Sequence, residues 1–530
     1  MLPERAKTRK TPIPKQGEET TMTFLKRAAL SAMLMAGTAL ATPVLAEDLK
    51  IAMDQIFQKM DPHNSNYNVD YSVASGVLER LITFDANMKL VPQLATEWEG
   101  SDDAKTFTFK LREGVTFHDG TPFDAAAVKA NFDRLADQSQ NLAKNSLFKV
   151  VDTVETPDDY TVVLNLKEPF GAMINTVAHP SVVIHSPKAL EELDVQKNPV
   201  GTGPFIFKEW IPGERVVLEK NDDYWDSEWP KVDTVTFYPV TESATRVSML
   251  LSDEVQFVHV LPAELSERVE NDDSAEVLEV PGITVWTASL NMLKDKFKDQ
   301  RVRRAFNLAV DQEAFIDVVY SGHGVVPDSP IAPDTRFYES QGAFGTDLEE
   351  ARALMKEAGH EDGFDVEIWG INNSTGVRML QFLQQQLSQI NVRAKIVPME
   401  GATRSEKLFS SVDPETAEFD MVMGGWSPST GDADWHLRPV YATEGWVPKI
   451  YNMAFYSNET VDQAIADALN TGDADARAEA YATAQKQIWE DAPAVWLAIE
   501  NKMAGRKKGL SGVFQMPDGT MQYAKAEYQN

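Results

Sequence analysis

The sequence predicts an α/β protein of two or three domains. Segments with strand patterns and segments with helix patterns alternate along the chain, as in folds where helices cover sheets. The 530 residues exceed what one globular domain usually holds. A hydrophobic fraction of 43% is ordinary for a globular chain, and no fixed-period repeat is present.

The N-terminal region predicts a secretory signal peptide over residues 22–46. Lys26 and Arg27 form a positive n-region, and an apolar run follows at 28–40. Val44-Leu45-Ala46 supplies the small residues that signal peptidase requires. The apolar run is shorter than the about 20 residues that span a bilayer, so an uncleaved anchor helix is the weaker alternative.

Residues 1–21 are polar and basic, and they match no part of a signal peptide. We interpret them as the product of a start codon assigned upstream of Met22, so the expected mature chain begins at Glu47. The sequence contains no cysteine, which excludes lipid attachment to a cysteine after cleavage, disulfides and Cys-ligated metal. We therefore expect a periplasmic protein that is not lipid-anchored.

The chain is acidic, with a formal net charge of −31. Without residues 1–46 it keeps 43 basic and 78 acidic residues, a net charge of −35. Such a surface repels nucleic acid and anionic membranes. The simplest interpretation of the negative charge is that it keeps the protein in solution. An anionic ligand would therefore need a local concentration of Arg or Lys.

Individual elements can be placed by periodicity and capping signals. Residues 106–111 alternate polar and apolar side chains, as in a half-buried strand, and 161–166 are similar. Asp124 can cap a helix with an apolar face. Ser374 or Thr375 can cap another, which leads into a strand at 394–397.

Four long segments, taken together, resemble the large peptide-type (family 5) solute-binding proteins of ABC importers. They are LREGVTFHDGTPFDAAAVKANFDRL (111–135), PVGTGPFIF (199–207), NDDYWDSEWPKVDTVTF (221–237) and RVRRAFNLAVDQEAF (301–315). They occur in the family's order, and the resemblance covers the mature chain. It implies solute capture for an importer and no enzymatic activity.

The C-terminal half is similar to the glutathione-binding members of that family. The similarity lies in residues 372–396, 425–446 and 452–469, including the QFLQQQL run and the pattern GWSPSTGDADW. It implies glutathione or a related small peptide as the ligand and membrane permease subunits as partners. It also implies a monomer without a cofactor or bound metal.

The family resemblance implies a two-lobed clamshell that closes on its ligand. On that template the first lobe comprises 47–287 and 497–530, with an inserted subdomain at about 86–199. The second lobe comprises 288–496.

One departure from the family pattern bears on the ligand. Dipeptide and oligopeptide binders hold the peptide ammonium with an Asp three residues after the Trp of a Gly-Trp motif. Here the motif is Gly425-Trp426, and Ser429 stands at that position. The glutathione-binding pattern also has Ser there, which favours a γ-glutamyl ligand over an ordinary peptide.

The candidate site follows from the charges of glutathione. Two carboxylates require Arg or donor-rich subsites, for which we predict Arg378 and Arg404. Free N–H groups at a helix start can add donors. The remaining candidates are the segment before that helix, ammonium ligands and aromatic walls: Asn372, Asn373, Ser374, Thr375, Ser429, Thr430, Asp432, Asp434, Trp426, Trp435 and Phe57.

Each candidate has a structural alternative. Arginines commonly form surface ion pairs, Asp432 and Asp434 can be turn residues after Gly431, and tryptophans are often core. A general peptide binder and a metal or haem carrier of the same fold remain alternatives. The eight histidines give no HExxH or HxH spacing, and GxSxG is absent, which argues against an enzyme.

Overall fold

A computed structural model describes residues 48–410 and 412–529. The proposed start segment 1–21 and the predicted signal peptide 22–46 lie outside the described residues. Within the described part of the chain, every helix is too short or too polar to cross a membrane.

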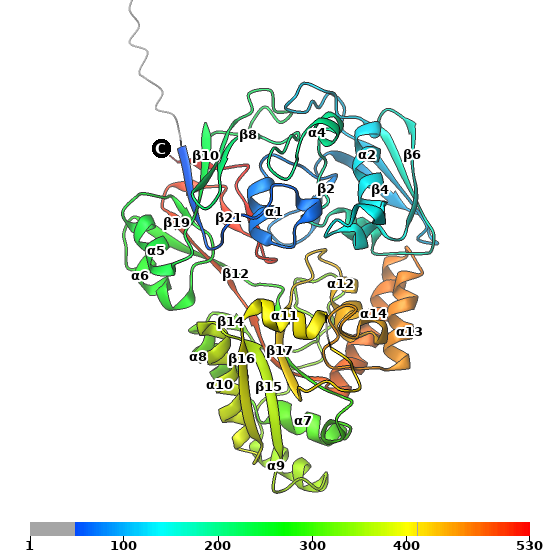
Figure 1. The fold of residues 1–530 in the computed structure, drawn as a ribbon, viewed down its shortest axis with the longest axis vertical. Coiled ribbons are helices and arrows are strands. Elements are labelled where there is room, and N and C mark those ends of the chain that lie inside the picture. Colours follow the sequence, from blue (N-terminus) through cyan, green and yellow to red (C-terminus); the bar gives the residue numbers. More distant parts are fainter. Residues whose placement is uncertain (1–47, 411, 530) are drawn as a thin grey trace, which may run out of the picture. The chain divides into compact units, whose positions relative to one another are not determined.

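A seven-stranded mixed sheet organises the first lobe (Figure 1). Its strand order is β12-β19-β11-β1-β10-β9-β8. The central β1 pairs in parallel with both neighbours, with Ile51 opposite Phe237 and Phe257. Such a doubly buried strand must be apolar, as residues 49–53 largely are. The strands are β1 (Asp48–Met53), β8 (Phe205–Ile211), β9 (Arg215–Lys220), β10 (Thr234–Pro239), β11 (Phe257–Val258), β12 (Ala275–Val280) and β19 (Lys502–Lys507).

Helices and short hairpins complete this lobe. The helices are α1 (Asn68–Ala74), α5 (Ser243–Leu251) and α6 (Ser266–Glu270). The C-terminal strands form two small pairs, β20 (Leu510–Ser511) with β23 (Glu527–Tyr528) and β21 (Phe514–Gln515) with β22 (Met521–Gln522).

A subdomain is inserted between β1 and β8, around a four-stranded antiparallel sheet of order β4-β5-β7-β6. Its strand β5 coincides with the predicted 106–111 segment, and Phe107, Phe109 and Leu111 are buried on one face. The Asp124 carboxylate caps α2 by accepting from Ala127 N, as predicted. The elements are β2 (Ile82–Phe84), β3 (Leu90–Pro92), β4 (Ala95–Gly100), β5 (Thr106–Leu111), α2 (Ala125–Ala136), β6 (Val151–Asp158), β7 (Thr161–Leu166), α3 (Met173–Val177) and α4 (Pro187–Glu192).

The second lobe is built on a six-stranded sheet of order β14-β18-β13-β17-β15-β16. The strands are β13 (Val285–Leu290), β14 (Gly324–Val325), β15 (Asp365–Ile371), β16 (Arg393–Met399), β17 (Met421–Trp426) and β18 (Ala494–Glu500). The helices are α7 (Gln300–Leu308), α8 (Gln312–Tyr320), α9 (Leu348–Glu357), α10 (Ser374–Ser388), α11 (Gly401–Phe409), α12 (Asp434–Tyr441), α13 (Glu459–Leu469) and α14 (Ala474–Asp491). Short 3₁₀ turns lie at Pro62–Asn64, Gln138–Gln140, Asn145–Phe148, Ala263–Leu265, Asp295–Phe297 and Thr443–Gly445.

The chain passes between the two large sheets at 281–284 and at Asn501. The boundaries drawn from the family template, after 287 and after 496, fall inside β13 and β18. These two strands pair with each other, with Val285 opposite Ile499, so both lie wholly in the second sheet.

One apolar cluster joins the inserted subdomain to helices α12–α14 of the second lobe, which lie beside it (Figure 1). It includes Phe107 and Phe132 on one side and Ile465 and Ile488 on the other. Two backbone hydrogen bonds cross the same junction: Gly171 N donates to Leu469 O (2.8 Å), and Gly472 N donates to Asp102 O (3.0 Å). These contacts hold the subdomain against the second lobe in this structure.

Candidate functional site

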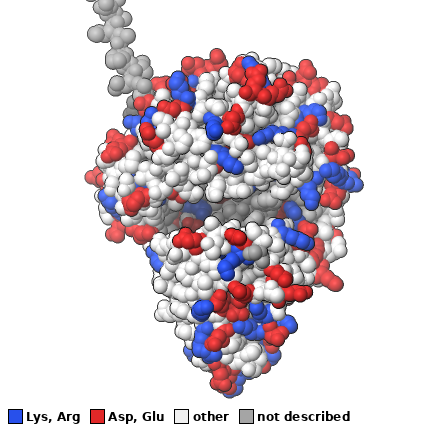
Figure 2. All heavy atoms as spheres, in the orientation of Figure 1, with Lys and Arg blue, Asp and Glu red and all other residues white. Residues whose placement is uncertain are grey.

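Two adjoining cavities lie where the first lobe faces the second. The larger, about 500 Å³, is lined by residues of both lobes, among them Asp54 and Arg246 from the first and Arg378 from the second. The smaller, about 310 Å³, is lined by residues of the second lobe, among them Arg404. Both are lined by Tyr320, Thr375 and Glu500. We call the two cavities together the interlobe cleft, and Figure 2 shows a hollow between the upper and lower parts of the molecule on the face drawn.

Unpaired polar atoms are concentrated around this cleft. A buried polar atom without a partner costs about 1–3 kcal/mol, so folded proteins contain few of them. Of the buried side-chain atoms without a partner in residues 48–410 and 412–529, those on cleft residues are Arg246 Nε, Tyr320 Oη, Arg378 Nε, Arg404 Nε, Ser427 Oγ, Asn501 Oδ1 and Gln515 Oε1. Their clustering is typical of a site that a polar ligand completes.

The three cleft arginines differ in how far they are already engaged. Arg246 donates from Nη1 to Val240 O (2.8 Å) and from Nη2 to Val260 O (3.1 Å), so it is largely a scaffold group. Burial lowers its pKa, against the opposing charge of Asp54.

Arg378 and Arg404 are less engaged than Arg246. Arg378 makes one long hydrogen bond to Thr375 Oγ1 (3.4 Å) and lies 3.8 Å from the Glu264 carboxylate. Arg404 is buried and donates from Nη2 to Met423 O (2.8 Å). Both guanidinium groups therefore have donors left for a ligand carboxylate.

The start of α10 positions one wall of the cleft. Asn373, rather than Ser374 or Thr375, is the N-cap, because its Oδ1 accepts from Gly376 N (2.7 Å). This corrects the predicted cap by one or two residues and leaves Ser374 and Thr375 lining the larger cavity. Asn373 itself lines the smaller cavity, whereas Asn372 lines neither.

The two aspartates predicted to bind an ammonium group are used by the protein itself. Asp432 Oδ1 pairs with Arg477 Nη2 at 2.9 Å, and both side chains are buried. Asp434 forms a two-pronged ion pair with Arg438 (2.8 Å for each contact). Neither lines the interlobe cleft, so we do not retain them as ligand residues.

The remaining candidates lie near the cleft without lining it. Thr430 O accepts from Asn175 Nδ2 (2.8 Å), and Ser429 N donates to Ser427 O (2.9 Å). Ser427, which the sequence analysis passed over, is the residue of this loop that lines the larger cavity.

The predicted aromatic walls are replaced by other rings. Phe57 is buried in the core against Phe237, with ring centroids 6.4 Å apart. Trp426 donates from Nε1 to the backbone of Trp435. Trp435 lines a separate cavity of about 360 Å³ beside the inserted subdomain. Trp286, Tyr320 and Tyr451 supply the rings of the smaller cavity instead.

The sequence analysis also missed the acidic and basic groups at the junction of the lobes. Glu500 Oε2 accepts from Trp286 Nε1 (3.2 Å) and from Lys502 Nζ (3.1 Å). Burial raises the pKa of Tyr320, and the charge of Glu500 adds to the shift. No motif marks these residues, because strand pairing alone brings them to the cleft.

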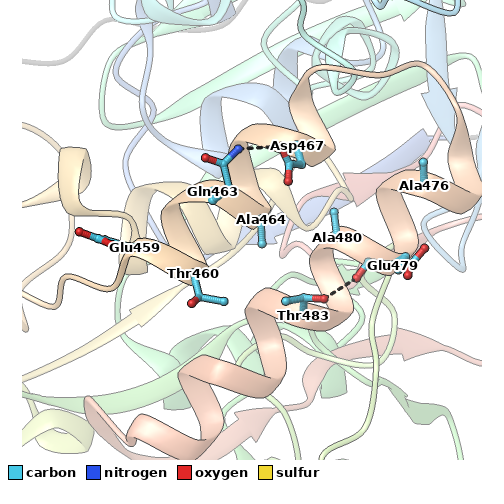
Figure 3. Close-up of a pocket in the computed structure, with 9 residues that line it drawn as sticks. All are labelled: Glu459, Thr460, Gln463, Ala464, Asp467, Ala476, Glu479, Ala480 and Thr483. Carbon is cyan, nitrogen blue, oxygen red and sulfur yellow. Dashed lines mark hydrogen bonds between the residues drawn. The ribbon is translucent and has the colours of Figure 1, made fainter.

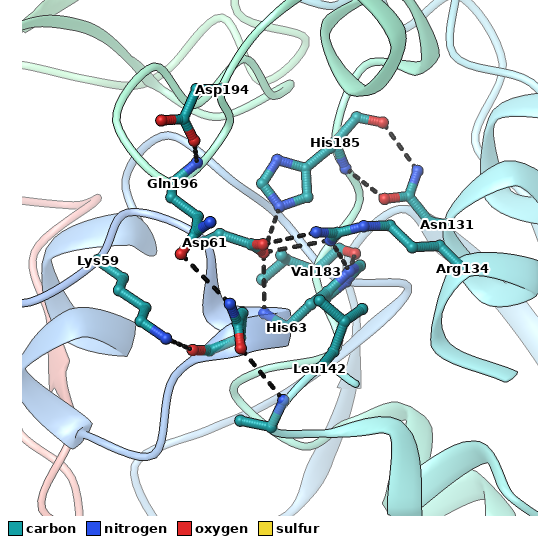
Figure 4. Close-up of polar contacts among 12 residues, drawn as sticks. Lys59, Asp61, His63, Asn131, Arg134, Leu142, Val183, His185, Asp194 and Gln196 are labelled. Carbon is teal, nitrogen blue, oxygen red and sulfur yellow. Dashed lines mark hydrogen bonds and ion pairs between the residues drawn. The ribbon is translucent and has the colours of Figure 1, made fainter. Parts of the chain in front are cut away.

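A buried cluster outside the cleft has the composition of a metal site (Figure 4). The ligand atoms of Asp61, His63 and His185 lie within 4.8 Å of one another. However, the Arg134 guanidinium contacts Asp61 Oδ2 and His63 Nδ1, both at 2.7 Å. Burial lowers the pKa of His63 to about 3. Arg134 already supplies the positive charge that a cation would bring. The contacts of Arg134 with Asp61 and His63 tie the segment after β1 to α2.

An open groove of about 710 Å³ runs along the surface where α13 and α14 pack together (Figure 3). Small residues such as Ala464 and Ala480 line it, with Glu459, Asp467 and Glu479 around them. Its polar groups pair locally: Gln463 Nε2 donates to Asp467 Oδ1 (2.7 Å). The groove lacks the buried, unpaired donors that distinguish the interlobe cleft within the described residues.

Residues 89–448 match the family model described as bacterial extracellular solute-binding proteins, family 5 middle. The chain belongs to this family. The match covers more than half of the sequence and includes most of the inserted subdomain, α10, α11 and the Gly425-Trp426 loop.

Full-length relatives support the family assignment. The chain is 37% identical over 512 residues to the glutathione-binding protein GsiB of Pectobacterium atrosepticum, covering 96% of this chain and 99% of that protein. It is 36% identical over 503 residues to GsiB of Escherichia coli K12, covering 94% and 97%.

Solved structures of family members share the fold. HbpA2 from Haemophilus parasuis gives a TM-score of 0.80 at 26% identity, covering 91% of this chain and 100% of that one. The periplasmic binding protein DppA from Helicobacter pylori, solved with the peptide STSA, gives 0.75 at 25% identity, covering 92% and 99%. The expected α/β periplasmic binding protein fold is confirmed.

Proposed function

We propose that this family member captures glutathione, or a closely related small peptide, in the interlobe cleft and delivers it to the permease of an ABC importer. The observation that carries the proposal is the pair of cleft arginines with donors left for a ligand, Arg378 and Arg404, each with an unpaired Nε atom. In a chain this acidic, two incompletely paired guanidinium groups in one cleft suit a ligand with more than one carboxylate. The names of its relatives agree with such a ligand.

The proposal extends to location and partners. Family membership indicates an extracellular or periplasmic protein. Cleavage after Ala46, the absence of a lipid anchor and a monomeric state remain part of the proposal. So does closure of the two lobes about the crossings at 281–284 and Asn501.

One contact between side chains has the composition of a hydrolase site, the rival class of function. Ser266 Oγ lies 3.5 Å from His323 Nε2, and His323 Nδ1 lies 3.0 Å from Glu279 Oε2. The serine is only 5% exposed and lines neither cavity of the cleft. A nucleophile that substrate cannot reach supports binding rather than catalysis, and we assign this contact to the junction between lobes.

Titration calorimetry on the mature chain tests the proposal. The panel comprises reduced glutathione, glutathione disulfide, dipeptides and unmodified tripeptides. We expect glutathione to bind, and Arg404→Ala to weaken its binding by about 10-fold or more, because a charged hydrogen bond contributes about 1.5–3 kcal/mol. Arg393→Ala is the matched control, since Arg393 forms an exposed ion pair with Asp365 away from the cleft.

Two results would contradict the proposal at different levels. Binding of plain peptides without glutathione would remove the glutathione assignment and keep peptide capture. An unchanged affinity in Arg404→Ala would remove Arg404 from the site.

A further inference from the structure

Glu500 occupies a special position in the cleft. It ends β18, directly before the Asn501 crossing, and in the described chain it is the only carboxylate residue that lines both cavities. Its side chain is 31% exposed. Both of its contacts, from Trp286 Nε1 and Lys502 Nζ, use Oε2, which leaves Oε1 available to a ligand.

The other carboxylates near the cleft are less suited to an ammonium group. Asp54 Oδ1 pairs with His259 Nδ1 (3.2 Å). Asp518 is buried and accepts from Thr520 N (2.8 Å) and Oγ1 (2.7 Å). Glu264 lines only the larger cavity and lies beside Arg378.

Glu500 and Arg404 both line the smaller cavity. Gly424 and Gly425 line it as well. A Cβ on Gly424 would lie 2.9 Å from Tyr451 Oη and 3.4 Å from Arg404 Nη2. A Cβ on Gly425 would lie 2.9 Å from the Trp286 ring. The glycine pair therefore lets the guanidinium and the Trp286–Glu500 pair approach the same space.

We infer that Glu500 determines ligand specificity by pairing with the primary ammonium group of the ligand, while Arg404 pairs with the α-carboxylate beside that ammonium. The amino-acid head group then occupies the smaller cavity. The rest of the ligand extends past Tyr320 and Thr375 into the larger cavity, where Arg378 meets the distal carboxylate. This inference rests on the proposed function and adds the orientation of the ligand.

The inference explains how the site works without an Asp at the position of Ser429. An ammonium group needs a carboxylate in a cleft that is partly removed from water, because charge-assisted hydrogen bonds are then strongest. Asp432 and Asp434 are committed to arginines. Glu500 is the acidic group left between the two cavities of the cleft.

A cycle of two ligands and two proteins tests the inference by calorimetry. The ligands are glutathione and its des-amino analogue, glutaryl-cysteinyl-glycine, and the proteins are the wild type and Glu500→Gln. We expect wild type to bind the analogue at least about 10-fold more weakly than glutathione. Glu500→Gln should lose a similar factor for glutathione and change little for the analogue.

Two controls separate a ligand contact from a structural effect. Glu219→Gln removes an exposed carboxylate that also pairs with a lysine, Lys208, and that lines neither cavity; it should leave both affinities unchanged. Glu500→Gln/Lys502→Gln keeps the net charge of the pair and should lose the preference for the amine just as the single variant does.

The outcomes distinguish this inference from the proposed function. Equal weakening of both ligands by Glu500→Gln, or no weakening, would overturn the role of Glu500 while glutathione capture stands. If wild type binds plain peptides instead, the same cycle with a peptide and its N-acetyl form still decides the role of Glu500. Failure of wild type to bind any ligand with a free amine would overturn both.

Discussion

The substitution Asp432→Asn separates a structural role from a ligand role for a residue that the sequence suggested as an ammonium ligand. Asp432 and Arg477 are 0% and 3% exposed, and their charged atoms lie 2.9 Å apart. Burial alone would lower the pKa of Arg477, but the Asp432 carboxylate and Tyr481 together outweigh it and raise that pKa. Removing one partner of a buried ion pair costs about 3–5 kcal/mol. We expect a loss of about 3 kcal/mol of folding free energy, because Asn keeps one acceptor oxygen.

Urea unfolding followed by circular dichroism measures this loss, and calorimetry on the folded variant measures ligand affinity. The affinity should be unchanged, since Asp432 lines neither cavity of the cleft. Asp365→Asn, in the exposed pair with Arg393, is the matched control and should leave stability nearly unchanged. A loss below about 1 kcal/mol together with weaker ligand binding would refute the structural role and restore Asp432 to the site.

Two further predictions concern pH and the junction between subdomain and second lobe. Burial lowers the pKa values of His63 and His436 to about 3, so the unfolded chain takes up protons below about pH 6.5 that the folded chain does not. The free energy of unfolding should therefore fall as the pH drops from about 6.5 toward 3. His436→Phe should make the urea midpoint depend less steeply on pH. An unchanged slope would show that His436 does not contribute. Gly171→Ala would place a Cβ 2.3 Å from Thr471 O, so it should lower the melting temperature and speed proteolysis of the subdomain. Gly401→Ala meets nothing within 4 Å and is the control; equal melting temperatures for the two variants would count against a tight junction at Gly171.

Local elements with strong periodicity were predictable from the sequence. The alternation at 106–111 is confirmed as β5, because one face packs on the subdomain core. The Asp124 cap is also confirmed, because a carboxylate placed before an apolar-faced helix accepts hydrogen bonds from the first N–H groups of that helix. The cap of α10 was misplaced by one or two residues because Asn373, Ser374 and Thr375 all suit that position.

The candidate site was predictable only in part. Arg378 and Arg404 were singled out by charge and resemblance, and both line the cleft. Glu500 could not be found, because an acidic side chain in a chain with 81 acidic residues carries no signal until strand pairing places it. The ion pair of Asp432 could not be foreseen, because its partner, Arg477, lies 45 residues further along the chain.

The apolar cluster shared by the inserted subdomain and α12–α14 has a calorimetric consequence. Any opening that separates these elements exposes apolar surface to water, and such exposure raises the heat capacity. A ligand that binds the open form and closes it should then show a strongly negative heat-capacity change, whereas a ligand that enters an already closed cleft should show a small one. The temperature dependence of the binding enthalpy therefore reports which form of the protein meets the ligand.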